Sequence, residues 1–561
     1  MSSLDWVVLI GTIAFIVLYG MWKTRGAADM DTYFRGGNTL RWPTIGLSIM
    51  ATQASAITFL SVPGQAYEDG MRFVQFYFGL PLAMIVISAV FVPIYYRLNV
   101  YTAYEVLEHR FDARVRYLGA VLFLIQRGLA AGITIYAPAI ILSAILGWDL
   151  QLTVIAMGAA VVLYTVTGGT NAVAQTQKQQ MIVMLTGMVV AAVAVFVRLP
   201  GNVTLPAALD LAGALGRMNV VSFELDASSR YNFWSGITGG FFLALSYFGT
   251  DQSQVQRYLS GRSLAESRLG LLFNGMLKIP MQFLILLTGV MVFVFHLFTP
   301  APIFFNEPAL QRVASGAHAA ELSDLQQRYA EASDGQTEAA SAFVDARGDE
   351  AAQAHAKAAL RSAAAQVETL REEAKVLIAR ASPDTETQDA DYIFLSFVLR
   401  YVPAGLVGLL VAVILCAAMS SIASELAALG STTTIDLYKT LVARESSPAR
   451  DLTASKAFTV LWGVVAVAFA SFAALLDNLI EAVNILGSIF YGTVLGLFLV
   501  AFFVRRVTAT PVLIGALTAQ ATVIALFFFS ELGFLWFNVI GCGIVVVVAS
   551  VAESMRGASA S

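Results

Sequence analysis

The sequence predicts an all-α polytopic membrane protein with about 13 transmembrane helices, and three observations carry this prediction. The 561 residues are 58% hydrophobic and only 13% charged, with a mean hydropathy of +0.72, a composition foreign to water-soluble domains. Apolar runs of about 18 residues or more, enough to cross roughly 30 Å of hydrocarbon, recur along the chain. Small and polar residues interrupt two of these runs at corresponding places.

Charge and cysteine content exclude several function classes. The net charge is −4, and the acidic excess lies in one segment, 307–391, which argues against a basic nucleic-acid binder. The only two cysteines, Cys416 and Cys542, lie in apolar runs, so no disulfide framework or thiolate metal cluster is expected. None of the four histidines stands in an HExxH pattern. We expect no enzyme activity.

The apolar runs place the helices in order. The first begins with Asp5 instead of a basic segment, so we interpret it as a retained helix and not as a signal peptide. Lysine and arginine are concentrated in alternate loops, such as those with Arg25, Arg110, Arg262 and Arg505, which predicts an outside N-terminus and an inside C-terminus in the cell (inner) membrane. The predicted spans are 5–22, 43–65, 73–96, 118–146, 152–169, 180–198, 231–255, 270–298, 392–424, 454–475, 479–504, 509–530 and 534–552.

Two of these spans have the composition of broken helices. In 43–65, Ser48, Thr52 and other hydroxyl residues interrupt the apolar run, and 231–255 is rich in glycine before Asp251. Unwound backbone at membrane depth is tolerated where it lines a cavity or is covered by protein, so such segments indicate a binding site. The alternative is that small residues here only allow close helix packing.

The two broken helices each open a set of five helices, and the two sets run in opposite directions, which predicts a 5+5 inverted repeat. The predicted organisation is 1–42, first transmembrane helix and cytoplasmic loop; 43–199, first five-helix repeat; 200–230, extracytoplasmic loop; 231–504, second five-helix repeat, interrupted by the extracytoplasmic insertion 300–391; and 505–561, two C-terminal transmembrane helices with a short cytoplasmic tail.

The insertion 300–391 combines abundant alanine and charged residues with leucines at helical spacing, such as Leu322 and Leu325. Breaks are predicted at 333–335 and 347–349, so we expect two or three exposed helices, forming a hairpin. A solvated spacer and a docking or regulatory element are both compatible with this composition. We expect the insertion to be peripheral to folding and uptake.

A cluster of small residues from Cys416 to Ser424 includes the adjacent hydroxyls of Ser420 and Ser421. Hydroxyls of this kind, together with carbonyls freed by a neighbouring unwound helix, could supply the hard oxygens that a sodium ion prefers. The same hydroxyls could instead bond back to carbonyls of their own helix.

The chain resembles the sodium/solute symporters. This family includes sodium/galactose and sodium/proline carriers and has a LeuT-type inverted-repeat fold. The resemblance runs from the first helix to about residue 504, outside the insertion. The motifs that carry it are Leu47-Ser48 through Gly64, Gly168-Gly169 through Gln180, Tyr247-Phe248-Gly249-Thr250-Asp251-Gln252 with Val255-Gln256-Arg257, Leu277-Lys278, and Ala417 through Asp436-Leu437-Tyr438-Lys439.

The resemblance implies a sodium site built from three backbone carbonyls and two hydroxyls. The matching carbonyls are those of Ala51, Ala54 and Ala417, and the matching hydroxyls are those of Ser420 and Ser421. Some relatives bind a second sodium with help from an aspartate after the paired glycines. Here Gln177 stands at that place with Lys178 beside it, so we expect one co-transported sodium per cycle.

The resemblance also implies a substrate pocket, whose residue types depart from those of the galactose carrier. Lys278 and the proposed inner gate, Tyr247, keep the family residue, whereas an acidic sugar contact has become Tyr77 and a glutamine has become Glu481. Galactose itself is therefore not supported. The full set of substrate-binding candidates is Thr58, Gln75, Tyr77, Ala244, Tyr247, Phe248, Lys278 and Glu481.

Charge inside the membrane costs several kcal/mol unless it is paired, hydrated or functional. Lys278 and Glu481 could pair with each other across the pocket, which suits a sugar or polyol. Alternatively Lys278 is the counter-charge of a carboxylate substrate while Glu481 is protonated or faces water. Arg127 and Asp251 are expected to be structural or gating charges near the cytoplasmic side, and Glu425 to face the inner vestibule.

These observations predict a sodium-coupled symporter that imports a small organic solute by alternating access, with a sugar or polyol favoured. The partners are then the solute, sodium and the lipid bilayer, with no nucleic acid. The alternatives are a sodium-coupled carrier of a monocarboxylate or amino acid, and a membrane sensor with the same fold that does not transport.

Overall fold

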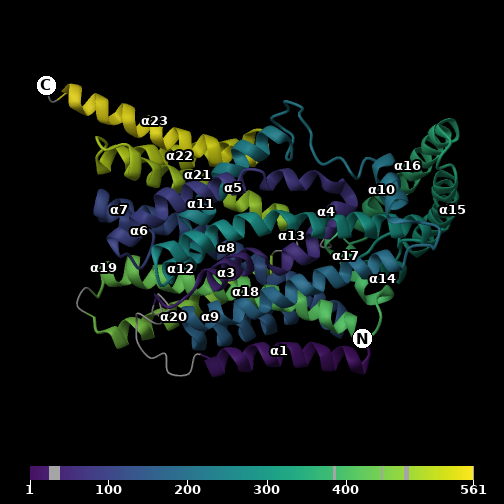
Figure 1. The fold of residues 1–561 in the computed structure, drawn as a ribbon, viewed down its shortest axis with the longest axis horizontal. Helices are drawn as coiled ribbons and strands as arrows, with labels where there is room; N and C mark the ends of the chain where they lie inside the picture. The colour runs from purple at the N-terminus through teal and green to yellow at the C-terminus, as the bar shows by residue number, and fades with distance from the viewer. Residues whose placement is uncertain (24–37, 383–386, 444–445, 473–478, 560–561) are drawn as a thin grey trace.

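The computed structural model describes residues 1–23, 38–382, 387–443, 446–472 and 479–559. The predicted loop residue Arg25 lies outside them. Helices run side by side along the long axis of the molecule (Figure 1). In chain order the elements are α1 (Ser3–Lys23), α3 (Trp42–Gln53), α4 (Ala56–Asp69), η2 (Gly70–Tyr77), α5 (Leu80–Val86), η3 (Ile87–Phe91), α6 (Val92–Leu98), α7 (Glu105–Arg110), α8 (Ala113–Leu146), α9 (Leu150–Val197), α10 (Leu205–Ala214), η4 (Ser235–Gly239), α11 (Gly240–Gly249), α12 (Gln252–Leu259), α13 (Leu264–Phe298), α14 (Glu307–Ala314), α15 (Ala319–Asp345), α16 (Glu350–Ala381), α17 (Ala390–Tyr401), α18 (Leu406–Thr432), η5 (Thr433–Tyr438), α19 (Lys439–Leu441), α20 (Pro448–Ala470), α21 (Leu479–Phe503), α22 (Ala509–Phe529) and α23 (Leu535–Ser559).

The predicted all-α membrane fold is confirmed. Among the described residues, nine helical stretches are long and apolar enough to cross a membrane, and shorter apolar helices such as Ser3–Ile16 and Leu150–Leu163 accompany them. Many large apolar side chains on the outside of the bundle are exposed, including Leu163, Val464 and Phe529. Exposing so many apolar side chains to water would be unfavourable, so this outer surface is the kind that faces lipid.

Two predicted span boundaries were wrong. The predicted helix 392–424 is divided into α17 and α18, because Pro403 and Gly405, whose φ is +87°, interrupt helical hydrogen bonding. The freed amides of Gly405 and Gly408 donate to a carboxylate oxygen of Asp5 in α1, at 2.6 and 3.0 Å. Conversely, both 152–169 and 180–198 fall within one element, α9, so the loop predicted between them is helical.

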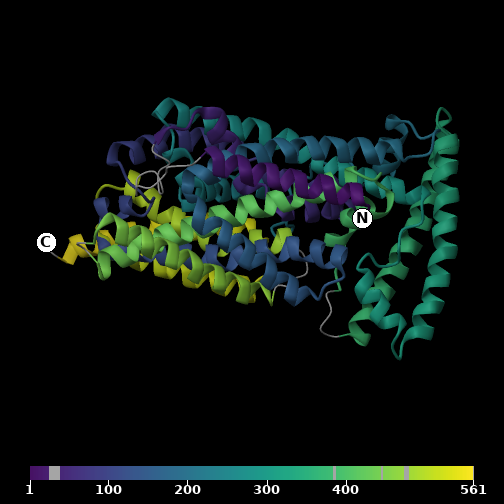
Figure 2. The ribbon, with the colours of Figure 1, turned by 90° about the horizontal axis from the view of Figure 1, so that it is seen from below.

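The insertion is a helical hairpin, as predicted, made of α15 and α16 with α14 packed beside it. The break predicted at 333–335 does not occur, because α15 continues through these residues, whereas Gly348, with φ +100°, ends the helix as expected. The hairpin lies across one end of the bundle, where the N-terminus is also found, and the C-terminus lies at the opposite end (Figures 1 and 2). This placement agrees with an outside N-terminus and an inside C-terminus.

The insertion is anchored to the bundle and is not an isolated spacer. The ammonium of Lys375 on α16 lies 4.0 Å from the carboxylate of Glu68 on α4. Arg347 pairs with Asp210 of α10 at 2.8 Å. The Nε of Arg361 donates to the Ala214 carbonyl at 2.8 Å. Because these contacts reach separate parts of the outer surface, the hairpin covers that end of the helical bundle.

Candidate functional site

The first predicted helix break lies between α3 and α4. Ala54 leaves the helical conformation, with φ −81° and ψ 78°, while its amide still donates to the Met50 carbonyl at 2.7 Å. Ser55 is extended and begins α4. Carbonyls that precede such a break lose their normal helical partners. The break therefore exposes backbone oxygens next to buried side chains of α18.

The second break lies between α11 and α12, at Thr250 and Asp251. Here the unwound backbone is satisfied by tyrosines from the first set of helices: Tyr95 donates to the Gly249 carbonyl at 2.5 Å and Tyr104 to the Thr250 carbonyl at 3.0 Å. The prediction of two broken helices is thus confirmed at both places.

The predicted sodium ligands on α3 and α18 meet at the first break. The Ser420 hydroxyl donates to the Ala51 carbonyl at 2.8 Å, and the Ser421 hydroxyl lies 3.5 Å from the same oxygen and 3.1 Å from the Thr52 carbonyl. The alternative, in which the pair bonds back to its own helix, is not what these contacts show. Ala54 and Ala417 are completely buried beside them. The site thus presents neutral oxygens from two helices.

Gln177 of α9 lies against the same two helices and is fully buried. Its amide nitrogen donates to the Ser420 carbonyl at 3.1 Å, the Ser424 hydroxyl at 2.6 Å and the Thr52 hydroxyl at 3.1 Å. Its amide oxygen accepts from Ser48. The amide nitrogen of Gln177 therefore donates to three oxygens of α3 and α18 beside the predicted sodium ligands.

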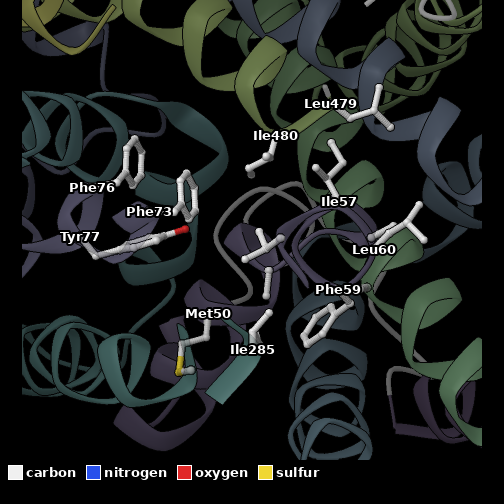
Figure 3. Close-up of a cluster of buried hydrophobic side chains, with 14 of the residues drawn as sticks. Met50, Ile57, Phe59, Leu60, Phe73, Phe76, Tyr77, Ile285, Leu479 and Ile480 are labelled. Atoms are coloured by element: carbon white, nitrogen blue, oxygen red, sulfur yellow. The ribbon is translucent and has the colours of Figure 1, made fainter. Parts of the chain in front are cut away.

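Tyr77, one of the substrate-binding candidates, belongs to a cluster of buried apolar side chains (Figure 3). In Figure 3, Phe73 and Tyr77 lie on one side of this cluster, and Ile57 and Leu60 lie on the other, with Ile480 nearby. The other candidates Thr58, Ala244 and Phe248 are buried. The cluster provides the low-polarity walls that small-molecule sites usually have.

Lys278 is the one candidate in this pocket that brings a full charge into an apolar setting. Its side chain is fully buried, and its ammonium lies 5.6 Å from the centre of the Tyr77 ring, a cation–π contact. Among the described residues, the ammonium has no hydrogen-bond acceptor and no ion-pair partner. A buried ammonium without an acceptor is costly, and an anion beside it would offset that cost.

Of the two alternatives for Lys278 and Glu481, the structure does not show the one in which they pair with each other. Glu481 instead forms an ion pair with Arg230, with an N–O distance of 2.5 Å, and accepts from the Tyr231 hydroxyl at 3.4 Å. The reason is position: Arg230 precedes the second broken helix and its half-exposed side chain reaches the outer end of α21, where Glu481 begins that helix. Among the residues that the structure describes, Lys278 therefore has no carboxylate partner.

Two other candidates have structural partners. Gln75 is bound at both ends of its amide, donating to the Tyr231 carbonyl at 3.2 Å and accepting from the Ser222 amide at 3.0 Å, so it holds the loop before the second broken helix. The hydroxyl of Tyr247 accepts from Gln254 at 2.6 Å, and its ring lies 5.3 Å from the Arg127 guanidinium. Tyr247 therefore joins the pocket to a polar network.

That network is centred on Arg127 and links four helices. Arg127 of α8 pairs with Asp251 at the second break and, at 3.1 Å, with Glu425 of α18, and it donates to the Tyr491 hydroxyl of α21 at 2.7 Å. All of these side chains are buried. Sequence reasoning identified the charges but missed Tyr491, because an aromatic residue in an apolar helix carries no local sign of a polar partner.

The model of one protein family, "Sodium:solute symporter family", matches residues 33–323 and 374–519 and leaves out most of the hairpin. The chain belongs to the sodium:solute symporter family. Membership agrees with the prediction that the chain is a transporter of the membrane and not an enzyme.

Curated members of the sodium:solute symporter family are similar over about half of the chain. The human sodium/iodide cotransporter is 35% identical over 282 residues, which are 49% of this chain and 43% of that protein. Human sodium-coupled monocarboxylate transporter 1 is 34% identical over 273 residues, 48% of this chain and 44% of that protein. The matched region thus spans less than half the length of either relative.

Among solved structures, a Na+-coupled sialic acid symporter in a substrate-bound outward-open state matches the fold. The TM-score is 0.77 at 20% sequence identity, and the match covers 99% of this chain and 98% of that one. At this identity the likeness establishes the shared fold of the helical bundle.

Proposed function

We propose that this chain is a sodium-coupled symporter that imports a small organic monocarboxylate across the cell membrane by alternating access. The observation that carries the proposal is the fully buried Lys278, whose ammonium lacks a carboxylate partner among the described residues. The names of similar family members, a monocarboxylate transporter and an iodide cotransporter, support an anionic solute. The earlier preference for a sugar rested partly on a Lys278–Glu481 pair that does not form.

The two breaks suggest how the cycle would be organised. Sodium between α3 and α18 would replace the hydrogen bonds from Ser420 and Ser421 to α3 and hold the two helices at a set distance. The solute carboxylate would neutralise Lys278, and its apolar part would pack on Tyr77 and the adjacent aromatic rings. Tyr247, already bound to the Arg127 network, would gate the inner side.

The direct test is uptake into proteoliposomes with an inward sodium gradient. Labelled monocarboxylates, amino acids, sugars and polyols would be compared at equal concentration, with a potassium gradient as the control. We expect uptake of monocarboxylates only, and only with sodium. Sodium-dependent uptake of a neutral sugar would overturn the substrate assignment, and the absence of any flux would favour the sensor.

Removing one hydroxyl of the proposed sodium site should weaken sodium binding. Ser421→Ala deletes one of about five ligands, and we expect the sodium concentration for half-maximal uptake to rise several-fold. Ser431→Ala is the matched control, because Ser431 is buried on the same helix but bonds to its own helix at Ala428. If Ser420→Ala and Ser421→Ala both left the sodium dependence unchanged, the site would lie elsewhere.

The proposed stoichiometry of one sodium to one monocarboxylate predicts electroneutral transport. One cation and one monoanion carry no net charge, so an imposed membrane potential should not change the rate of uptake, and the Hill coefficient for sodium should be close to one. In Gln177→Asp a carboxylate replaces the amide donor, so we expect sodium cooperativity to rise. Gln179→Asp, on a half-buried neighbour, is the control. Voltage-driven uptake by the unmodified protein would contradict a single sodium.

A further inference from the structure

A cavity lies at the outer end of the molecule, under the helical hairpin. Its volume is about 380 Å³, within the range of small-molecule sites. Its walls include the outer ends of α4 and α13, the loop after α10, and residues of α15 and α16. Lys278 and Tyr77 do not line it, so it is separate from the pocket at the centre of the bundle.

Three arginines line this cavity. Arg371 is buried and is held by Asp389, while its guanidinium lies 5.9 Å from the centre of the Tyr67 ring. Arg217 lies 4.9 Å from the centre of the Phe293 ring, and Arg361 is anchored through its Nε to the Ala214 carbonyl. These contacts hold the guanidinium groups in place before any ligand binds.

Of the three arginines, Arg371 is paired with Asp389, whereas Arg217 and Arg361 form no ion pair among the described residues. Glu68 lies 4.0 Å from the ammonium of Lys375, and Glu368 is exposed on α16. Among the described residues, Arg217 forms no ion pair, and burial lowers the pKa of Arg217 below its ordinary value although Glu368 lies nearby. An anion in the cavity would offset the free-energy cost of burying the charged guanidinium of Arg217.

Two guanidinium donors that line the cavity lack a partner among the described residues. Nε of Arg217 and Nε of Arg371 are buried without an acceptor. Buried polar groups normally have hydrogen bonds, so two such donors around one cavity indicate a ligand that supplies acceptors.

We propose that this outer cavity is a second binding site, which takes a small aromatic carboxylate. The carboxylate oxygens would accept from the arginines, whose planar groups match its geometry. The ring would pack on Tyr67, Phe293 and Tyr329, which line the same cavity. This site does not depend on which solute the central pocket transports.

A ligand at this site would bridge the hairpin and the transport bundle. It would touch α4, whose other end forms the first break, and α13, which carries Lys278. Occupancy would hold the outer end of α4 against α15 and α16. The hairpin, which lies largely outside the family match, would thereby add a ligand-dependent contact to a family fold.

The test is calorimetric titration of the purified full chain with benzoate in sodium-free choline buffer. Benzamide, of the same shape without the charge, is the ligand control. We expect saturable binding of benzoate at one site and at least tenfold weaker binding of benzamide. Because the central site is proposed to take its solute only with sodium, the sodium-free buffer removes that contribution, and Lys278→Met should leave benzoate binding unchanged. The outcome of this titration is thereby separate from that of the uptake assay.

Two variants test the cavity itself. Arg217→Gln should weaken benzoate binding at least tenfold, and Ala364→Leu, which fills the cavity from α16 without changing any charge, should do the same. Ala358→Leu is the matched control, because Ala358 is exposed on the same helix and does not line the cavity. Unchanged thermal melting of each variant would establish that it is folded.

Three results would overturn the proposal. The first is no saturable benzoate binding to the unmodified protein. The second is binding that Lys278→Met abolishes and that Arg217→Gln and Ala364→Leu leave intact, since benzoate would then occupy the central pocket. The third is equal binding of benzoate and benzamide, which would mean that the arginines do not recognise the charge.

Discussion

Lys278→Met is expected to abolish sodium-driven uptake of monocarboxylates. Methionine keeps the length and the apolar contacts of the side chain but removes the only full positive charge among the pocket candidates. Loss of one partner from a buried charge pair costs about 2 to 5 kcal/mol, which corresponds to a loss of roughly 30-fold or more in apparent affinity. The measurement is the initial rate of uptake into proteoliposomes over a range of solute concentrations.

The variant Lys278→Arg tests whether the positive charge alone is sufficient for uptake. A guanidinium keeps the charge with a different shape, so partial uptake with a raised KM for the solute and little change in sodium dependence is expected. Full monocarboxylate uptake by Lys278→Met would contradict the assigned role. In that case the ammonium would be a structural group that packs on the Tyr77 ring and does not bind the solute.

Arg127→Met is expected to cause the largest loss of stability. It leaves Asp251 and Glu425 as buried carboxylates without their shared cation, and breaking a buried pair in this way costs about 3 to 5 kcal/mol. The thermal melting temperature of the purified protein in detergent should fall by many degrees. Arg114→Met is the control, because Arg114 lies on the same helix and pairs with Asp112 at the surface, where a pair contributes about 1 kcal/mol or less.

The network also crosses the second helix break, so its loss should be visible in the local structure. Asp251 caps α12 through the Ser253 amide, at 2.9 Å, and contacts Arg127 from the same carboxylate group. We therefore expect faster backbone hydrogen exchange around the break in Arg127→Met than in Arg114→Met. Equal melting temperatures and equal exchange in the two variants would show that Arg127 is not a structural centre.

The sequence by itself determined the membrane class, the positions of the two helix breaks and the hydroxyl pair on α18. Each of these follows from local composition: apolar runs set the spans, and hydroxyl or glycine-rich stretches weaken a helix where they occur. The hairpin was predictable for the same reason, apart from the break at 333–335, where polar residues stayed helical within α15. Local propensity is a weak guide when neighbouring turns support the helix.

Only the tertiary structure decided which charges are paired. Arg230 and Glu481 are 251 residues apart, and Gln177 and Ser424 are 247 residues apart, so no local pattern indicates either contact. The same holds for the outer cavity, whose walls come from α4, α13 and the hairpin. Sequence composition sets the cost of burying a charge, but the packing of distant helices decides which group offsets that cost. Here that packing buries Lys278 without an acceptor among the described residues.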